Sequence, residues 1–137
     1  MAVVEELIRN ESDGTLSFGN YSLSDKSKLN DFKHDGDLFK VKTFREITKL
    51  ERNGLFVYES VPGTAVDHMK IREEEVTFSV EGPEDVEITL ELEPETEYDI
   101  SVNNKDAGTM KTNLGGKLTL SVELEEGVSV PVRITKS

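Results

Sequence analysis

The feature that most restricts the fold of this chain is a strict alternation of apolar and polar residues through its C-terminal half. The alternation is most regular at Leu118, Leu120, Val122 and Leu124. A period of two predicts strands that bury one face and leave the other in solvent, as in antiparallel sheets. Apolar positions follow this period in the segments 76–80, 86–92, 98–102, 118–124 and 128–134.

Each alternating segment ends in residues that favour turns. Gly, Asn and Asp tolerate positive φ and Pro removes a backbone donor, so clusters of these residues predict where strands stop. Pro131 is different because it stands inside the last segment. A proline cannot donate to a sheet ladder, and we therefore expect that strand to lie at a sheet edge or to carry a bulge. The turn clusters occupy 82–85, 93–96, 103–106, 113–116 and 125–127.

The N-terminal half is less regular, and shorter strands are expected there. Asn53-Gly54 is a strong hairpin signal because both residues adopt positive φ with little strain. The segments 47–51 and 55–60 on either side are therefore expected to pair. Two further short strands and a charged connector are expected at 14–18, 38–41 and 67–75, in that order.

The first residues have a different spacing, which predicts a short helix over 2–9. Val3 and Leu7, and likewise Val4 and Ile8, are four positions apart and would share one helix face. A helix this short is not stable alone in water. We therefore expect these four side chains to dock on another surface, and they are the contact expected for self-association.

These elements together predict one all-β domain over 1–137, with an irregular half (1–75) and a regular half (76–137). A chain of 137 residues can bury about 68% of its unfolded surface, so a core can form without disulfides. Many short strands and almost no helix predict an antiparallel β-sandwich, of the jelly-roll or immunoglobulin/fibronectin-like kind.

Composition restricts the partners of the protein. The chain has 28 acidic and 16 basic residues, a net charge of −12 and no cysteine. Nucleic acids and anionic membranes attract Lys and Arg, so neither is expected as a partner. The lack of cysteine excludes disulfides and thiol chemistry. No basic and apolar leader and no run of about 20 apolar residues is seen, so the expected location is cytoplasmic.

The stretch Leu92-Glu-Pro-Glu-Thr-Glu-Tyr98 interrupts the alternation, and it resembles the corner between two strands in fibronectin type III and related sandwiches. The resemblance implies that the chain crosses from one sheet to the other there. Leu92 would anchor the first strand, and Pro94 would end it. Thr96 completes the motif, and Tyr98 would bury its ring and bond its hydroxyl to nearby backbone. Two further strands are expected over 117–135, whereas the fibronectin type III pattern has one strand there.

Two wider resemblances bear on function. The segment 98–124 resembles small β-sandwich modules appended to bacterial carbohydrate-active proteins, which implies an accessory role without catalysis. The whole chain resembles a family of small acidic proteins of anaerobic Gram-positive bacteria that often carry the label "endosialidase". That label names a phage enzyme with a large propeller domain, which 137 residues cannot contain, and no catalytic residue can be matched. The segments that carry the second resemblance are 2–8, 14–21, 56–64 and 112–118.

Candidate catalytic and metal-binding residues are few. His34 and His68 are interpreted as solvated histidines, one in a polar turn and one in the charged connector. Asp35-Gly36-Asp37 resembles part of a calcium loop, which makes Asp35 and Asp37 the metal candidates. A complete loop needs further oxygen ligands and a distal Glu. No cofactor is therefore expected.

Three functions stay open at this point. The first is a non-enzymatic, self-associating structural or assembly protein, with a homotrimer expected from the family resemblance. The second is a carbohydrate-binding accessory module. The chain has no Trp, so Tyr21 and Tyr58 are the candidates for stacking on a sugar, although Tyr58 and Phe56 have the spacing to share one strand face in the core.

The third function is a hydrolase that acts on sialylated glycans. Such an enzyme needs a cluster of arginines to hold the sugar carboxylate. The sequence does not favour a cluster, because its arginines are spread over Arg9, Arg45, Arg52, Arg72 and Arg133.

Overall fold

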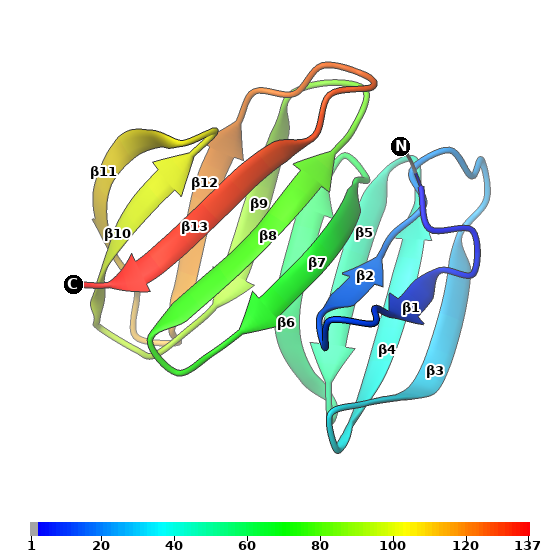
Figure 1. The fold of residues 1–137 in the computed structure, drawn as a ribbon, viewed down its shortest axis with the longest axis horizontal. Helices are drawn as coiled ribbons and strands as arrows, with labels where there is room; N and C mark the ends of the chain where they lie inside the picture. The colour runs from blue at the N-terminus through cyan, green and yellow to red at the C-terminus, as the bar shows by residue number, and fades with distance from the viewer. Residues whose placement is uncertain (1–2) are drawn as a thin grey trace.

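The structure, a computed structural model that describes residues 3–137, is a sandwich of two antiparallel sheets (Figure 1). The all-β antiparallel fold expected from the sequence is confirmed. One sheet has seven strands in the order β1 (Ile8–Asn10), β2 (Leu16–Phe18), β7 (Ala65–Ile71), β8 (Glu75–Glu81), β13 (Val130–Lys136), β10 (Glu97–Val102) and β11 (Lys105–Lys111). The other has six strands in the order β12 (Lys117–Val122), β9 (Val86–Glu91), β6 (Leu55–Val61), β5 (Ile47–Arg52), β4 (Asp37–Phe44) and β3 (Ser27–His34).

One core fills the space between the sheets and joins both halves of the chain. Inward positions of neighbouring strands are in register, as with Leu50, Tyr58 and Leu90 across β5, β6 and β9. The Tyr58 ring reaches the opposite sheet, where it lies edge-to-face with Phe18 (5.2 Å between centroids) and Phe78 (5.8 Å). Such pairs add about 0.5–1.5 kcal/mol beyond their burial. Tyr58 therefore helps to fix how the two sheets face each other.

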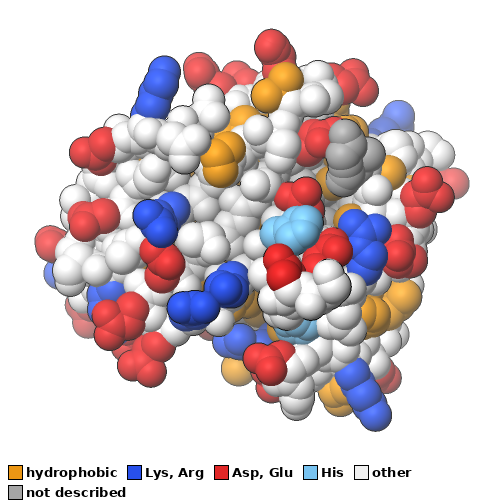
Figure 2. Space-filling model, viewed as in Figure 1, with side chains coloured by type: hydrophobic (Ala, Val, Ile, Leu, Met, Phe, Trp, Pro, Cys, Tyr) orange, Lys and Arg blue, Asp and Glu red, His pale blue; other side chains and the backbone are white. Residues whose placement is uncertain are grey.

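The outer face of the seven-stranded sheet is polar. Figure 2 shows acidic side chains interspersed with lysine and arginine on this face, and only scattered apolar side chains. This is the solvent-facing side that the alternation predicts for a two-layer antiparallel fold.

The hairpin expected at Asn53-Gly54 is confirmed. The two residues have φ values of 52° and 81° and connect β5 to β6. The other short strands expected in the N-terminal half occur as β2 and β4, and the five alternating segments occur as β8, β9, β10, β12 and β13.

The prediction of a helix over 2–9 is wrong. Residues 3–7 form an irregular turn, and Ile8 begins β1, which pairs with β2 so that Ile8 lies opposite Phe18. The Gly19 N–H donates to the Leu7 carbonyl (2.9 Å), which ties the turn to the end of β2. This long-range pairing overrides the weak helical spacing, because so short a helix has little stability of its own.

The apolar side chains of this segment dock on the chain's own core. Val4 and Ile8 are 0% and 1% exposed, and Val3 and Leu7 are half-buried. The surface that they need is therefore supplied within the monomer, which removes this argument for a contact between copies. Residue 2 of the expected helix lies outside the described residues.

The prediction of a connector over 67–75 is also wrong, because most of the segment belongs to β7 and β8. β7 is an interior strand between β2 and β8. A bulge at His68, where φ is 55°, adds a residue to β7, so that Val66 and Met69 both point into the core although they are three positions apart. The bulge breaks the period of two and hides the strand from sequence analysis.

The expectation that the last strand lies at an edge or carries a bulge at Pro131 is wrong. β13 lies between β8 and β10, and its pairing with β8 runs through Pro131 without a shift. The Pro131 carbonyl accepts from the Asn103 N–H (2.8 Å), beyond the end of β10. Since the N and O atoms of a strand residue point to the same neighbour, the missing N–H faces this turn, and no ladder bond is lost.

Two edge strands are not predicted by the alternation. In β3 a bulge near Asp31, where φ is 57°, places Leu29 and Phe32 three positions apart on the inner face. In β11 all seven residues are exposed, so no apolar period exists. The apolar pattern alone therefore reveals neither strand.

Candidate functional site

A cleft opens between the sheets at the end of the sandwich where β5 turns into β6, β7 into β8 and β9 into β10, at the lower end in Figure 1. Its volume is about 350 Å³. A second hollow of about 230 Å³ adjoins it, and Arg52, Met69, Ile71 and Arg72 line both. We call the two together the end cleft. Its apolar wall includes Leu55, Val57, Leu90, Leu92 and Tyr98.

Arg52 is the central polar side chain of the end cleft. It is the last residue of β5, and its register partners Phe39 and Leu55 place it on the inner face of the sheet. The side chain is half-buried and makes no hydrogen bond or ion pair with any residue of the described range 3–137. A guanidinium carries five N–H donors in a fixed planar arrangement. Arg52 therefore offers several unused donors to the space between the sheets.

Arg72 supplies a second guanidinium to the same space. It follows β7, and its backbone N–H donates to the Glu75 carbonyl (2.9 Å), which closes the turn to β8. Its side chain is exposed and has no ion-pair partner within residues 3–137. The sequence did not favour an arginine cluster, but Arg52 and Arg72 line the same cleft as a pair, because they lie at the start of the β5–β6 and β7–β8 turns at one end of the sandwich.

Six acidic residues line the end cleft, and none of them forms an ion pair with these arginines within residues 3–137. Three of the six bind other cations. Glu73 is exposed at the rim. The other three acids that line the larger cavity have partners outside it: Glu75 with Arg133 (2.9 Å), Glu91 with Lys117 (3.5 Å) and Glu93 with Lys136. The hydrogen bond that Lys136 donates to the Glu93 carboxylate also raises the pKa of Lys136. Arg52 and Arg72, together with Lys70 in the smaller hollow, are the cations of the end cleft that form no ion pair within residues 3–137.

The corner at 92–98 forms one wall of the end cleft. The chain leaves β9 in one sheet and enters β10 in the other. Tyr98 is 3% exposed, and its hydroxyl accepts from the Glu93 N–H at 3.2 Å. Thr96 donates its hydroxyl to the Pro94 carbonyl (2.9 Å). Leu92 is half-buried against the core.

Thr112 braces the same corner and has no counterpart in the sequence motif. It is buried, its hydroxyl donates to the Glu93 carbonyl (2.5 Å), and its oxygen accepts from the Thr96 N–H (2.9 Å). No local pattern identifies Thr112, because the residues that it joins are far from it in the chain.

Asp35 and Asp37 belong to a hairpin. Asp35 and Gly36 have φ values of 50° and 85° and form the two-residue turn between β3 and β4. The Asp37 carboxylate accepts from the Asn53 side-chain amide (2.9 Å). Both aspartates line the smaller hollow together with Arg52 and Arg72. Among residues 3–137, no group of three or more His, Cys, Asp or Glu side chains is placed to hold a metal ion.

His34 lies at the end of a strand and contacts its neighbours, rather than lying solvated in a turn. It ends β3, its Nδ1 lies 2.5 Å from the Asn10 side-chain oxygen, and its ring packs edge-to-face on Phe39 (5.6 Å). These contacts connect β1 of one sheet to β3 of the other. His34 thus helps to hold the edge of the sandwich beside the smaller hollow.

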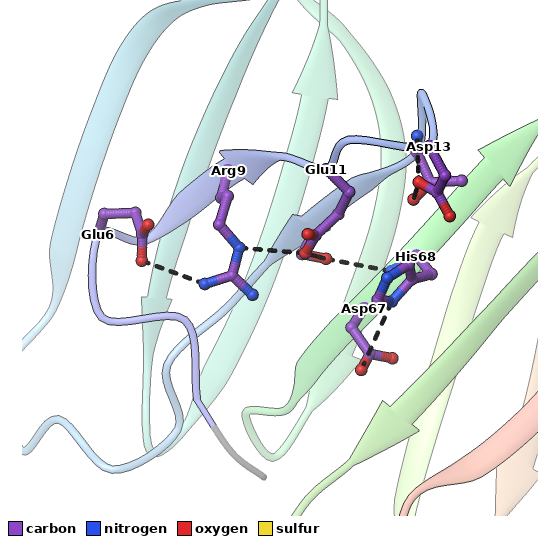
Figure 3. A network of polar contacts seen from close by, with 8 residues as sticks. Glu6, Arg9, Glu11, Asp13, Asp67 and His68 are labelled. Atoms are coloured by element: carbon purple, nitrogen blue, oxygen red, sulfur yellow. Dashed lines mark hydrogen bonds and ion pairs between the residues drawn. The ribbon is translucent and has the colours of Figure 1, made fainter.

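A second polar cluster joins β1, β2 and β7 (Figure 3). Ser17 donates its hydroxyl to the Glu11 carboxylate (2.5 Å) and accepts from the backbone N–H of His68 (3.1 Å). Arg9 bridges Glu11 (3.0 Å) and Glu6 (3.5 Å). The hydrogen bond from Ser17 and the contact with Arg9 lower the pKa of Glu11.

This cluster contains Ser, His and acidic residues but does not have the geometry of a hydrolase triad. A triad needs the histidine ring to take the serine proton. Here the Ser17 proton is directed at Glu11, while the His68 ring is 54% exposed and lies 3.8 Å from Asp67. The cluster instead satisfies the N–H that the bulge at His68 frees, so it stabilises the edge of the sheet.

Of the two tyrosines considered for sugar stacking, Tyr58 is excluded by its burial, whereas Tyr21 is half-buried. Tyr58 is 0% exposed in the core. A bulge at Val57 places Tyr58 inward and Phe56 on the outer face, so the two do not share a face as their spacing predicts. The Tyr21 hydroxyl donates to Glu81 (3.2 Å), and burial together with the Glu81 charge raises the pKa of Tyr21 to about 12.

Comparison with known proteins identifies no relative of this chain. No protein-family model, no curated protein and no solved structure matches this chain. The described residues also contain no helix that is long and apolar enough to cross a membrane. The function of the end cleft is therefore inferred from its own geometry.

Proposed function

We propose that the protein is a non-enzymatic binding module whose end cleft takes a small ligand that carries a carboxylate. The observation that supports this most is Arg52, a half-buried guanidinium on the inner face of the sheet with no acceptor among residues 3–137. Arginine holds carboxylates through two parallel hydrogen bonds. Arg72 at the same cleft adds a second cation.

The size and lining of the end cleft favour a small amphipathic molecule. Small-molecule sites have volumes of roughly 300–1,000 Å³, apolar walls and a few polar groups that fix orientation. The larger cavity, at about 350 Å³, meets the lower limit, and its apolar residues surround Arg52. Acidic sugars are our first candidates, since they combine a carboxylate with an apolar ring face. The resemblance of 98–124 to accessory modules of carbohydrate-active proteins favours the same class.

The proposal is a binder rather than a hydrolase because Ser17 and most of the acids that line the larger cavity have other partners. Ser17 and Glu11 bind each other, and Asp37 binds Asn53. The acids of the larger cavity are mostly paired with lysine or arginine.

Isothermal titration calorimetry tests this proposal. We expect N-acetylneuraminate or glucuronate to bind and uncharged glucose not to bind. Arg52→Gln should weaken the affinity by about tenfold or more, the value of a charge-assisted hydrogen bond. Arg45→Gln is the matched control, because Arg45 is exposed in the β4–β5 turn at the other end of the sandwich. Equal binding of glucose, or no effect of Arg52→Gln, would contradict the proposal.

A second candidate function, self-association as a structural protein, is favoured by β11. All seven residues of this strand are exposed, and β10 is its one partner in the sheet. An edge strand presents unpaired N–H and C=O groups on which a second copy can add a strand. The trimer implied by family resemblance stays part of this candidate.

Light scattering after size exclusion separates the two candidates. A mass that is a multiple of 15.3 kDa at micromolar concentration supports self-association. Ala107→Lys, which adds a charge to β11, should then lower that mass, as charged residues protect sheet edges. A single monomer peak at both low and moderate salt leaves the binding module as the one function.

A further inference from the structure

Four lysines gather on the outer face of the six-stranded sheet, away from the end cleft. The register places Lys28 of β3 and Lys49 of β5 on either side of Lys42 of β4. Lys40 lies on the same face two residues before Lys42. A hollow of about 90 Å³ lies among them and is lined by Lys28, Lys40, Lys42, Lys49 and Glu51. We call this surface the lysine hollow.

The lysine hollow is electrostatically unfavourable when it is empty. Like charges directly opposite each other on neighbouring strands destabilise a sheet. The one ion pair inside the hollow joins Lys49 to Glu51 (3.6 Å), and Lys28, Lys40 and Lys42 have no acidic partner within residues 3–137. Partial burial of the Lys42 ammonium and repulsion from Lys26, Lys49 and Lys28 lower the pKa of Lys42, and attraction to Glu59 opposes this shift.

This arrangement is not what composition predicts. The chain carries 28 acidic residues against 16 basic ones, so acids are the common surface residue. A lysine at the centre of a lysine row could be replaced by an acid with a gain in stability. Unfavourable local choices of this kind occur at functional sites, where stability is lost in favour of binding.

We propose that the lysine hollow binds a compact multivalent oxyanion, namely a phosphate or sulfate group. Neighbouring strands are about 4.8 Å apart, so the three lysines of the row lie within roughly 10 Å. Ammonium groups are compact point charges that surround a phosphate from several directions, whereas a carboxylate suits the planar fork of arginine. The hollow therefore differs in ligand from the end cleft, and this inference does not depend on the function proposed above.

The surroundings of the lysine hollow favour a single group over a long polyanion. The same outer face continues across β6 and β9 with Glu59, Glu87 and Glu91. A polymer that runs across the strands would meet these carboxylates directly. A single phosphate or sulfate group, free or as an ester on a small molecule, contacts the lysines alone.

Calorimetry and thermal unfolding with inorganic phosphate and with sulfate test the inference, with chloride at equal ionic strength as the control for screening. We expect phosphate or sulfate to bind and to raise Tm beyond the chloride control. Lys42→Gln should weaken binding at least about tenfold. The same variant should raise Tm in the absence of phosphate, because it removes the central repulsion. If Lys42 only supported the fold, Lys42→Gln would instead lower Tm in the absence of phosphate.

Lys105→Gln is the matched control, since Lys105 is exposed on β11 in the other sheet. It should leave phosphate binding unchanged. A titration with glucose 6-phosphate distinguishes the sources: tighter binding than inorganic phosphate identifies an ester, and equal binding identifies the free ion, and either supports the site. Stabilisation by chloride equal to that by phosphate and sulfate, or binding that Lys42→Gln does not change, would overturn the inference.

Discussion

The two ends of the sandwich differ in whether the polar side chains between the sheets have hydrogen-bond partners. At the end away from the cleft, buried hydroxyls satisfy one another. The Tyr58 and Ser60 hydroxyls each lie 2.8 Å from the Thr64 hydroxyl, and Thr48 donates to the Thr64 carbonyl (2.9 Å). Thr43 lies 2.8 Å from Thr48 and accepts from the backbone at Asn20. We call this the closed end.

The closed end is also packed against backbone. A Cβ added at Gly63 would overlap the Phe44 carbonyl oxygen, and one added at Gly19 would overlap the Thr64 carbonyl oxygen. A glycine is required at such close approaches. The closed end is therefore tightly packed, and its buried hydroxyls are paired with one another or with backbone. We call the opposite end of the sandwich, which contains the end cleft, the open end.

The inner face of β5 shows the contrast within one strand. Its successive inward residues are Thr48, Leu50 and Arg52. Thr48 is saturated by the hydroxyl network, Leu50 is fully buried in the core, and Arg52 has unused donors in the end cleft. A buried polar group without a partner costs free energy, and no buried side-chain nitrogen or oxygen within residues 3–137 lacks a partner. The unused Arg52 donors are therefore accessible from the end cleft, where a ligand can reach them, whereas the matched hydroxyls at the closed end contribute to stability.

The largest expected effect is a substitution that fills the closed end. Gly63→Ala should lower the free energy of unfolding by about 3 kcal/mol, because the new Cβ meets backbone that cannot move aside. Chemical denaturation measures this loss. Gly115→Ala is the matched control, since its nearest neighbour is a side-chain oxygen at 3.5 Å and no strain is expected. Equal stabilities would show that the closed end is looser than described.

The hydroxyl network should give the next largest effect. Thr64→Val keeps the shape but removes the acceptor and donor that Tyr58 and Ser60 share, and we expect a loss of about 2 kcal/mol. The control is Thr119→Val, which breaks an exposed hydroxyl pair with Thr89 and should change stability by less than about 0.5 kcal/mol. If the two variants lose the same free energy of unfolding, the buried network contributes no more to stability than an exposed hydroxyl pair.

The corner in the wall of the end cleft should have a smaller effect. Tyr98→Phe removes one hydrogen bond to the Glu93 N–H, and the expected loss in unfolding free energy is about 1 kcal/mol. Tyr21→Phe, at a half-buried hydroxyl, serves as the comparison and should lose less. If Tyr98→Phe unfolds at the same denaturant concentration as the parent, the hydrogen bond of the Tyr98 hydroxyl does not stabilise the corner.

The smallest effect on stability is expected at the open end. Arg52→Leu should change the free energy of unfolding by no more than about 0.5 kcal/mol, because no contact with the described residues is lost. Arg9→Leu should destabilise more, since Arg9 binds Glu11 and Glu6. A large loss from Arg52→Leu would mean that Arg52 supports the fold rather than a ligand.

The sequence predicts the sheets but not the site, for identifiable reasons. Alternation reveals strands such as β12, where the period is unbroken. Bulges at Asp31, Val57 and His68 shift the period in β3, β6 and β7, and their position depends on the neighbouring strands. The Asp35-Gly36 turn did carry a local signal for the β3–β4 hairpin, because Asp-Gly favours this turn type.

Arg52 was also within reach of sequence analysis. Its position two residues after Leu50 and just before Asn53-Gly54 places it inward at a strand end. The proximity of Arg52 to Arg72 was not predictable, because the two residues are 20 positions apart and their strands belong to different sheets. Only the assembled sandwich brings them to one cleft.

The most direct test of the contrast between the ends is a titration of the ¹⁵N-labelled protein with N-acetylneuraminate or glucuronate, followed by backbone amide chemical shifts. We predict that shifts concentrate at the open end, around Arg52, Leu55 and Ile71, while Thr48 and Thr64 at the closed end stay unchanged. Arg52→Gln should abolish the changes at the same ligand concentrations. Shifts centred on the closed end, or none with either acid, would contradict the claim that the end cleft is a carboxylate-binding site.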